Sequence, residues 1–101
     1  MTLNWEQVQE EVGNVSSRIA AFLERGRFVG VDGHVVTIGF AKQEMAARGM
    51  IENLDNMSVL TSICERLSGQ TVRLRIVELT ESDAPGPTMA QLRAAKEKNN
   101  G

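Results

Sequence analysis

The chain has 101 residues, a formal net charge of −2, one histidine and a single cysteine, Cys64, which cannot form an internal disulfide. This length allows one domain at most, and the slight negative charge argues against a protein that binds nucleic acid mainly by bulk electrostatics. No run of about 18 apolar residues and no N-terminal signal pattern occurs, so we expect a cytoplasmic domain with no membrane partner.

The first expected element is an amphipathic helix that begins at Trp5, with Asn4 as its N-cap, and stops before Gly26. Its apolar residues recur every three or four positions, as they do on one face of a helix. The residues of this stripe are Trp5, Val8, Val12, Val15, Ile19 and Phe22. Gly13 and the pair Ser16-Ser17 lower the helix propensity, so a bend is expected in the middle.

Residues 28–31 and 34–40 are predicted to form a β-hairpin. The dipeptide Asp32-Gly33 between two β-branched runs is typical of a type I′ turn. The alternation places Val29 and Val31 on one side of the first strand, and it buries one face of the second strand. Glycines inside these strands, at positions 30 and 39, indicate a bulge or a close approach of two backbones.

Two helices and a final strand are expected next. A short helix over residues 41–48 would end at Gly49, and a second would cover about 56–67. Asp55 or Asn56 would cap the second helix, and Ser68-Gly69 would close it. The strand over residues 71–77 alternates apolar side chains with Arg73 and Arg75, which is typical of a sheet with one exposed face.

Residues 80–101 differ in composition from the rest and are expected to form a linker and a short helical tail. The linker contains two prolines, and a capping-box pattern begins at Thr88. Met89 and Leu92 are the only large apolar residues of the tail, so they are its candidate anchors in the groove of a partner. An inert tail is the alternative. The predicted folded domain is residues 1–79.

No catalytic, metal-binding or cofactor-binding residues are expected. His34 lies beside the hairpin turn, and Cys64 lies on the apolar stripe of a helix, where a thiol is inert. One histidine and one cysteine are too few for a typical zinc site, and no phosphate-binding or dinucleotide-binding motif occurs. The chain is therefore predicted not to be an enzyme.

The expected order α-β-β-α-α-β, an α+β fold, is that of a type II KH domain with helices covering a three-stranded sheet. The crossover through the helix pair should set the third strand parallel to the second, and the first helix should cover the inner sheet face. KH domains clamp nucleic acid with a GXXG loop between adjacent helices. Residues 48–55, at that junction, contain one glycine and two acids. The literal GXXG of residues 30–33 lies in the hairpin and contains an aspartate.

This pattern favours a protein-interaction module over nucleic-acid binding by the domain alone. A domain that binds single-stranded nucleic acid through the face of Arg73 and Arg75 is kept as an alternative. These two arginines are also candidate interface residues for a protein partner.

Several segments together resemble the C-terminal region of the tau subunit of bacterial DNA polymerase III, the clamp-loader subunit. The similarity covers about residues 3–79. It is carried by Trp5 at the start of a helix that ends in Ala21-Phe22-Leu23, and by residues 36–40, 52–56, 65–69 and 72–77.

This resemblance implies a fragment that ties the clamp loader to the catalytic subunit of the replicative polymerase during DNA replication. Two related interpretations imply the replicative helicase as partner. One is the N-terminal domain of the initiator DnaA, which has the same element order and an early tryptophan, and the other is the KH-like domain of the helicase-loading protein DciA.

Overall fold

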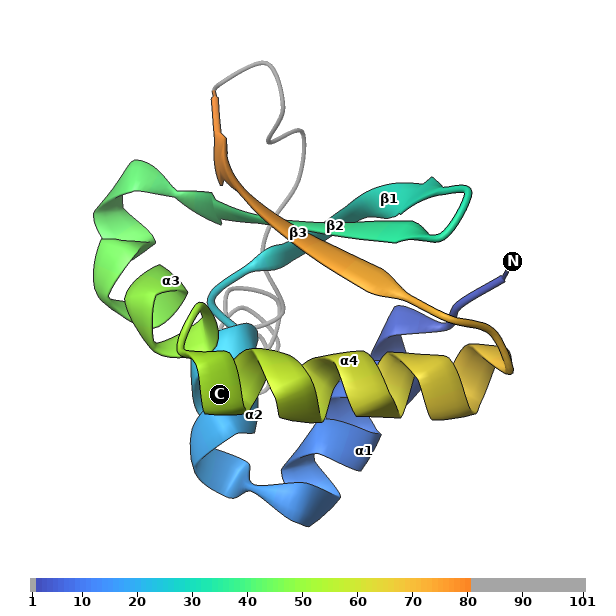
Figure 1. Cartoon of the computed structure of the whole chain (residues 1–101). Helices are drawn as coiled ribbons and strands as arrows, with labels where there is room; N and C mark the ends of the chain where they lie inside the picture. The colour runs from blue at the N-terminus through green and yellow to red at the C-terminus, as the bar shows by residue number, and fades with distance from the viewer. Residues whose placement is uncertain (1, 81–101) are drawn as a thin grey trace, which may run out of the picture.

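The computed structural model describes residues 2–80, which form a small α+β domain with four α-helices and a three-stranded mixed sheet (Figure 1). Its elements, in chain order, are α1 (Trp5–Val15), α2 (Ser17–Leu23), β1 (Arg27–Asp32), β2 (Val35–Ala41), the 3₁₀ helix η1 (Lys42–Glu44), α3 (Met45–Ile51), α4 (Leu54–Ser68) and β3 (Arg73–Leu79). The expected linker and helical tail, with Met89 and Leu92, lie outside the described residues.

The sheet has the strand order β1-β2-β3. Strand β2 pairs antiparallel with β1 and parallel with β3, so the predicted direction of the third strand is confirmed. The connection from β2 to β3 passes through η1, α3 and α4. Strand β2 is therefore the centre of the sheet, and both of its neighbours depend on it for their backbone hydrogen bonds.

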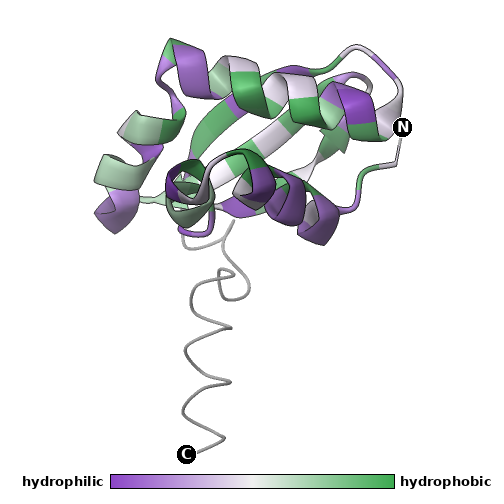
Figure 2. Cartoon of the chain, turned by 90° about the horizontal axis from the view of Figure 1, so that it is seen from below, coloured by the Kyte–Doolittle hydropathy of each residue, from purple (hydrophilic) through white to green (hydrophobic). Residues whose placement is uncertain are grey.

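Helices α1, α2 and α4 lie on one side of the sheet, below it in Figure 1, and α3 lies near one end. Three side chains of β2 point into this helical layer, and Val36, Ile38 and Phe40 are at most 1% exposed. Viewed from the helical side, hydrophilic and hydrophobic residues alternate along the helices, and the strands lie behind them (Figure 2). The core therefore occupies a single layer between the helices and the sheet.

The expected single helix at the start of the domain is wrong, because the chain forms two helices. Asn4 caps α1 as predicted, but Ser16 adopts an extended conformation (φ −157°, ψ 111°) and its hydroxyl accepts a hydrogen bond from the Ile19 N–H at 3.2 Å. This break changes the direction of the apolar stripe. Ile19 continues it as a buried residue, whereas Val15, which was predicted to belong to it, is 60% exposed.

The hairpin is confirmed, but its turn lies one residue later than predicted. Asp32 still pairs with Val35, so the two turn residues are Gly33 and His34. Gly33 has a φ of +61°, and within residues 2–80 no residue other than glycine has a positive φ. A type I′ turn needs positive φ at both central residues, whereas a type II′ turn needs it only at the first. The geometry therefore fits a type II′ turn that begins with glycine.

The predicted placement of Val29 and Val31 on one side of β1 is wrong, because the strand contains a β-bulge. Phe28 pairs with Ile38 and Gly30 with Thr37, which leaves Val29 as the extra residue. As a result Val31 packs against the core, while Val29 is 49% exposed. The bulge occurs beside a glycine, as the sequence indicated. Phe28, on the core side, stacks on Trp5 with ring centroids 5.3 Å apart.

The elements of the second half are present, with shifted ends. Helix α3 begins four residues later than expected, after η1, and runs past Gly49 to Ile51, so Gly49 does not end it. Helix α4 begins earlier, because Asn53 rather than Asp55 or Asn56 caps it by accepting a hydrogen bond from the Asp55 N–H at 3.0 Å. Gly69 closes α4 in the left-handed conformation, as predicted. Strand β3 occupies Arg73–Leu79 rather than residues 71–77.

The cap at Ser16 predicts a local loss of stability. Replacing Ser16 by alanine removes the acceptor for the Ile19 N–H, so the free energy of unfolding should fall by about 1 kcal/mol. Chemical denaturation measures this change. The matched variant Ser17→Ala alters an exposed residue of the first turn of α2 and should leave stability within about 0.5 kcal/mol of the wild type. Equal losses in both variants would show that the serine cap contributes nothing specific.

The glycine between α2 and β1 provides a second stability test. A Cβ atom built on Gly26 would stand 2.7 Å from the Phe40 ring, whereas one on Gly30 would meet nothing within 4 Å. We expect Gly26→Ala to destabilise the domain by about 1–3 kcal/mol through overpacking. Gly30→Ala should be neutral or slightly stabilising, and thermal unfolding of the two variants decides. A stable Gly26→Ala protein would mean that the ring of Phe40 moves aside without cost.

Candidate interaction surface

The sheet face turned away from α1, α2 and α4 is covered by no helix or strand of residues 2–80. We call it the open face. Side chains on a strand alternate between the two faces, and the strand register shows which residues share this one. They are Arg27, Val29, Gly30 and Asp32 of β1, Val35, Thr37 and Gly39 of β2, and Arg73, Arg75, Val77 and Leu79 of β3.

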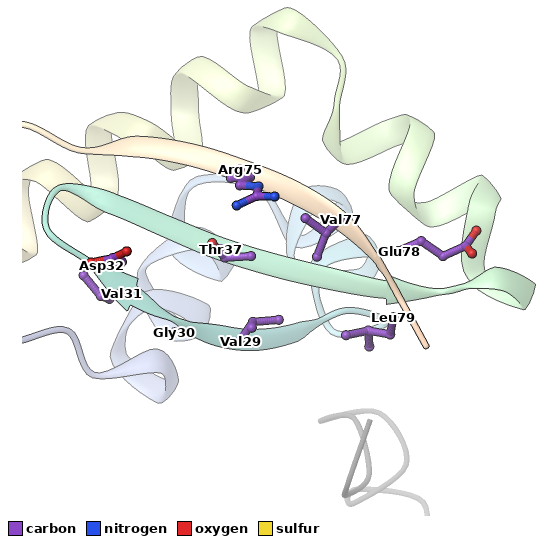
Figure 3. Close-up of a pocket in the computed structure, with 9 residues that line it drawn as sticks. All are labelled: Val29, Gly30, Val31, Asp32, Thr37, Arg75, Val77, Glu78 and Leu79. Carbon is purple, nitrogen blue, oxygen red and sulfur yellow. The ribbon is translucent and has the colours of Figure 1, made fainter. Parts of the chain in front are cut away.

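A shallow hollow of about 480 Å³ lies on the open face between β1 and β3 (Figure 3). Thr37 of β2 lies at its centre, Val29 lines it from β1, and Arg75 and Val77 line it from β3. Leu79 packs over Gly39 so closely that a Cβ atom there would clash with it. The hollow is therefore lined by both aliphatic and polar groups, with the guanidinium group of Arg75 at its side.

Arginine side chains give the open face a positive character. Of the ion pairs formed within residues 2–80, those of arginine join Arg25 to Glu44, Arg48 to Glu52 and Arg66 to Glu11. Arg27, Arg73 and Arg75 take part in none of these described ion pairs. Two acids lie at the margins of the hollow, Asp32 beside the hairpin turn and Glu78 at the opposite end (Figure 3).

Both arginines predicted from the sequence, Arg73 and Arg75, are exposed and lie on the open face. Arg75 lines the hollow, whereas Arg73 lies nearer the hairpin turn, where its backbone N–H donates to the His34 carbonyl at 2.8 Å. Their part in an interface stays a prediction. Sequence reasoning missed Arg27, because the expected strand began at Phe28. It also placed Val29 on the same side as Val31, because the bulge at Val29 is not visible in the simple alternation of β1.

The connection between α3 and α4 is short and acidic. It consists of Glu52 and Asn53, and Asn53 already caps the first turn of α4. The guanidinium of Arg48 donates to the Glu52 carboxylate at 3.2 Å, and Asp55 places a further acid in the first turn. Because these groups satisfy and neutralise the positive helix end, the junction is poorly suited to hold a phosphate group.

The chemically reactive side chains of the domain lie apart from one another. His34 is exposed in the hairpin turn, and Cys64 is 1% exposed in α4. Burial, with a smaller contribution from Glu65, raises the pKa of the Cys64 thiol to about 11. Residues 2–80 contain no group of three histidine, cysteine or acidic side chains that could hold a metal ion, and no helix among them is long and apolar enough to cross a membrane.

Comparisons of the chain with protein-family models, with curated proteins and with solved structures found no match. The open face and the sequence pattern are therefore the basis for a functional proposal.

The buried thiol predicts slow alkylation and a defined pH dependence. Cys64 should react with a thiol reagent at pH 8 only after the domain is unfolded, because its native pKa of about 11 lies above the ordinary 9.0. A raised native pKa means that the unfolded thiol ionises first. The stability contributed by the neutral thiol is therefore complete below pH 9 and is lost as the pH rises toward 11. Rapid labelling of the native protein would contradict the burial of this group.

Proposed function

We propose that the chain is a non-catalytic protein-interaction domain of the kind represented by the C-terminal region of the tau subunit of DNA polymerase III. In this role it tethers a clamp loader to the catalytic subunit of the replicative polymerase in the bacterial cytoplasm. The sequence resemblance over residues 3–79 names the partner, and the open face is the observation that carries an interaction role.

The order of elements supports the proposal. With α1 and α2 counted as one broken helix, the chain follows the α-β-β-α-α-β order of a type II KH-like domain. The α3–α4 junction, where a nucleic-acid-binding KH domain has its GXXG loop, contains Glu52 and Asn53 and is followed by Asp55. The literal GXXG, residues 30–33, lies in β1 and the hairpin turn. A KH-like scaffold with an acidic junction suits a protein partner better than a phosphate backbone.

The exposed side chains of the open face support a docking role. A sheet face without a covering layer exposes aliphatic surface, and Val29 is one of the large hydrophobic residues with high exposure in the described domain. Apolar surface ringed by polar groups often marks an interaction site. Here the aliphatic residues lie beside Arg75 in a hollow, which combines apolar contact with a charged group able to orient a partner.

Tethering requires no chemistry in the domain itself. The domain is attached to the clamp loader and holds the polymerase. Each new encounter of loader and polymerase is therefore an intramolecular event. The effective concentration of polymerase at the fork is then set by the linker rather than by diffusion through the cell. Inert, buried Cys64 and the exposed, isolated His34 are compatible with such a role.

A parallel binding assay tests the proposal. The immobilised 101-residue chain is exposed to the purified catalytic subunit of the replicative polymerase, to the replicative helicase and to a single-stranded oligonucleotide. We expect retention of the polymerase subunit alone. Retention of the helicase instead would favour the DnaA-like or DciA-like interpretation. Oligonucleotide binding that weakens steeply with salt would favour the nucleic-acid interpretation, because released counterions produce that dependence.

A further inference from the structure

We infer that the open face binds an extended, acidic segment of its protein partner. The carboxylates of this segment would pair with Arg73 and Arg75, and an aliphatic side chain would enter the hollow between Val29 and Val77. The inference rests on the proposed function and deepens it, because it names the surface and the chemistry of the partner segment.

The charges of the open face favour an acidic ligand. The whole chain has a net charge of −2, yet its open face gathers three arginines against one acid, Asp32, and these arginines take part in none of the described ion pairs within residues 2–80. Arg27 is half-buried, so Arg73 and Arg75 are the exposed members of this group. A guanidinium group presents a planar fork of donors that matches a carboxylate. An acidic ligand is therefore the complement of this surface.

The spacing of the side chains along β3 matches that of an extended peptide. Arg73, Arg75 and Val77 lie in one row of β3, and successive members of the row are about 7 Å apart along a strand. An extended peptide lying over the row repeats its downward side chains at the same distance. Acidic residues two positions apart would therefore meet both arginines together. The next downward side chain would lie over Val77, so it should be aliphatic.

The position of the aromatic rings favours a peptide over a single-stranded nucleic acid. Proteins that bind single strands stack bases on exposed aromatic rings. Here Trp5 stacks on Phe28 on the helical side of the sheet, and Phe40 is 1% exposed in the core. Phe22 also packs against the core cluster, so no aromatic side chain of residues 2–80 belongs to the open face. Recognition by the open face would therefore use aliphatic contacts and the guanidinium groups of its arginines.

The test uses the full chain, labelled with nitrogen-15, and three probes. The first is a peptide with the pattern Asp-x-Asp-x-Leu and uncharged polar residues at x. The second has lysines in place of both aspartates, and the third is an oligothymidylate. We expect the acidic peptide alone to shift the backbone resonances of the open face, among them those of Val29, Thr37 and Val77. Added salt should weaken its binding, because the contacts are exposed ion pairs.

Two substitutions with the same change of charge locate the contact. Arg75→Glu should weaken binding of the acidic peptide by about tenfold or more, because it replaces attraction by repulsion at the hollow. Arg18→Glu, on the exposed side of α2, should leave binding unchanged. Both residues are exposed, so both variants should fold, and equal melting temperatures verify this.

Several outcomes would overturn the inference. If the lysine peptide or the oligothymidylate bound as tightly as the acidic peptide, recognition would not depend on negative charge of a peptide. If Arg75→Glu and Arg18→Glu changed the affinity equally, the open face would not be the binding site. Shifts of the open face that depend on protein concentration without any peptide would identify a second copy of the chain as the occupant. Tighter peptide binding by a chain that ends at residue 80 would identify residues 81–101 as a competing occupant.

Binding of the catalytic subunit of the polymerase to the wild type and to the Arg75→Glu variant tests the tether and the docking surface separately. If it binds the wild type and the Arg75→Glu variant equally, the tether stands and the open face is not its docking site. If the acidic peptide binds the open face but the polymerase subunit does not bind the chain, the surface chemistry stands and the assignment of the partner is wrong.

Discussion

Phe40 heads the fully buried side chains of the described domain by volume, and its ring fills the space that a side chain at Gly26 would occupy. Phe40 belongs to the central strand, and Gly26 lies where the chain passes from α2 into β1. Their contact therefore fixes the distance between the helical layer and the sheet at the point where the two are joined. Val36 and Ile38, on the same face of β2, extend this packing along the strand.

The helices pack on one face of the sheet, and this arrangement decides how the polar groups of the domain are distributed. The apolar residues of the sheet are drawn toward the helices, and the other sheet face is left with mixed chemistry. The described ion pairs formed by Arg25, Arg48 and Arg66 are exposed, so each contributes little to stability. Stability therefore comes mainly from the packing of the helices on the sheet, and the arginines of the open face take part in none of these described ion pairs.

Much of this fold could be predicted from the sequence, because the decisive signals are local. The alternation of β2, the exposed arginines of β3 and the closing glycine of α4 all follow from periodicity and cap chemistry. The break at Ser16 could not be predicted as such. A serine hydroxyl competes with the helix for backbone hydrogen bonds, but a bend and a full break look the same in sequence.

The candidate surface was only half predictable for a related reason. On β3 the simple alternation holds, so Arg73 and Arg75 were assigned to the correct face. On β1 one extra residue, Val29, interrupts the register, and every side chain on one side of it changes face. A bulge depends on how two strands meet, and Gly30 indicates only that one is allowed. Val29 is therefore separated from the core-facing Val31 only once the pairing is known.

The parallel pairing of β2 with β3 also sets an order of events during synthesis. Val35 and Arg73 are partners although η1, α3 and α4 lie between them in the chain. The hairpin can close as soon as β1 and β2 leave the ribosome, because its contacts are local, whereas one edge of β2 must wait for the last element. Until β3 emerges, one edge of β2 therefore has no partner strand for its backbone hydrogen bonds, and an unpaired strand edge is a site where another chain can pair.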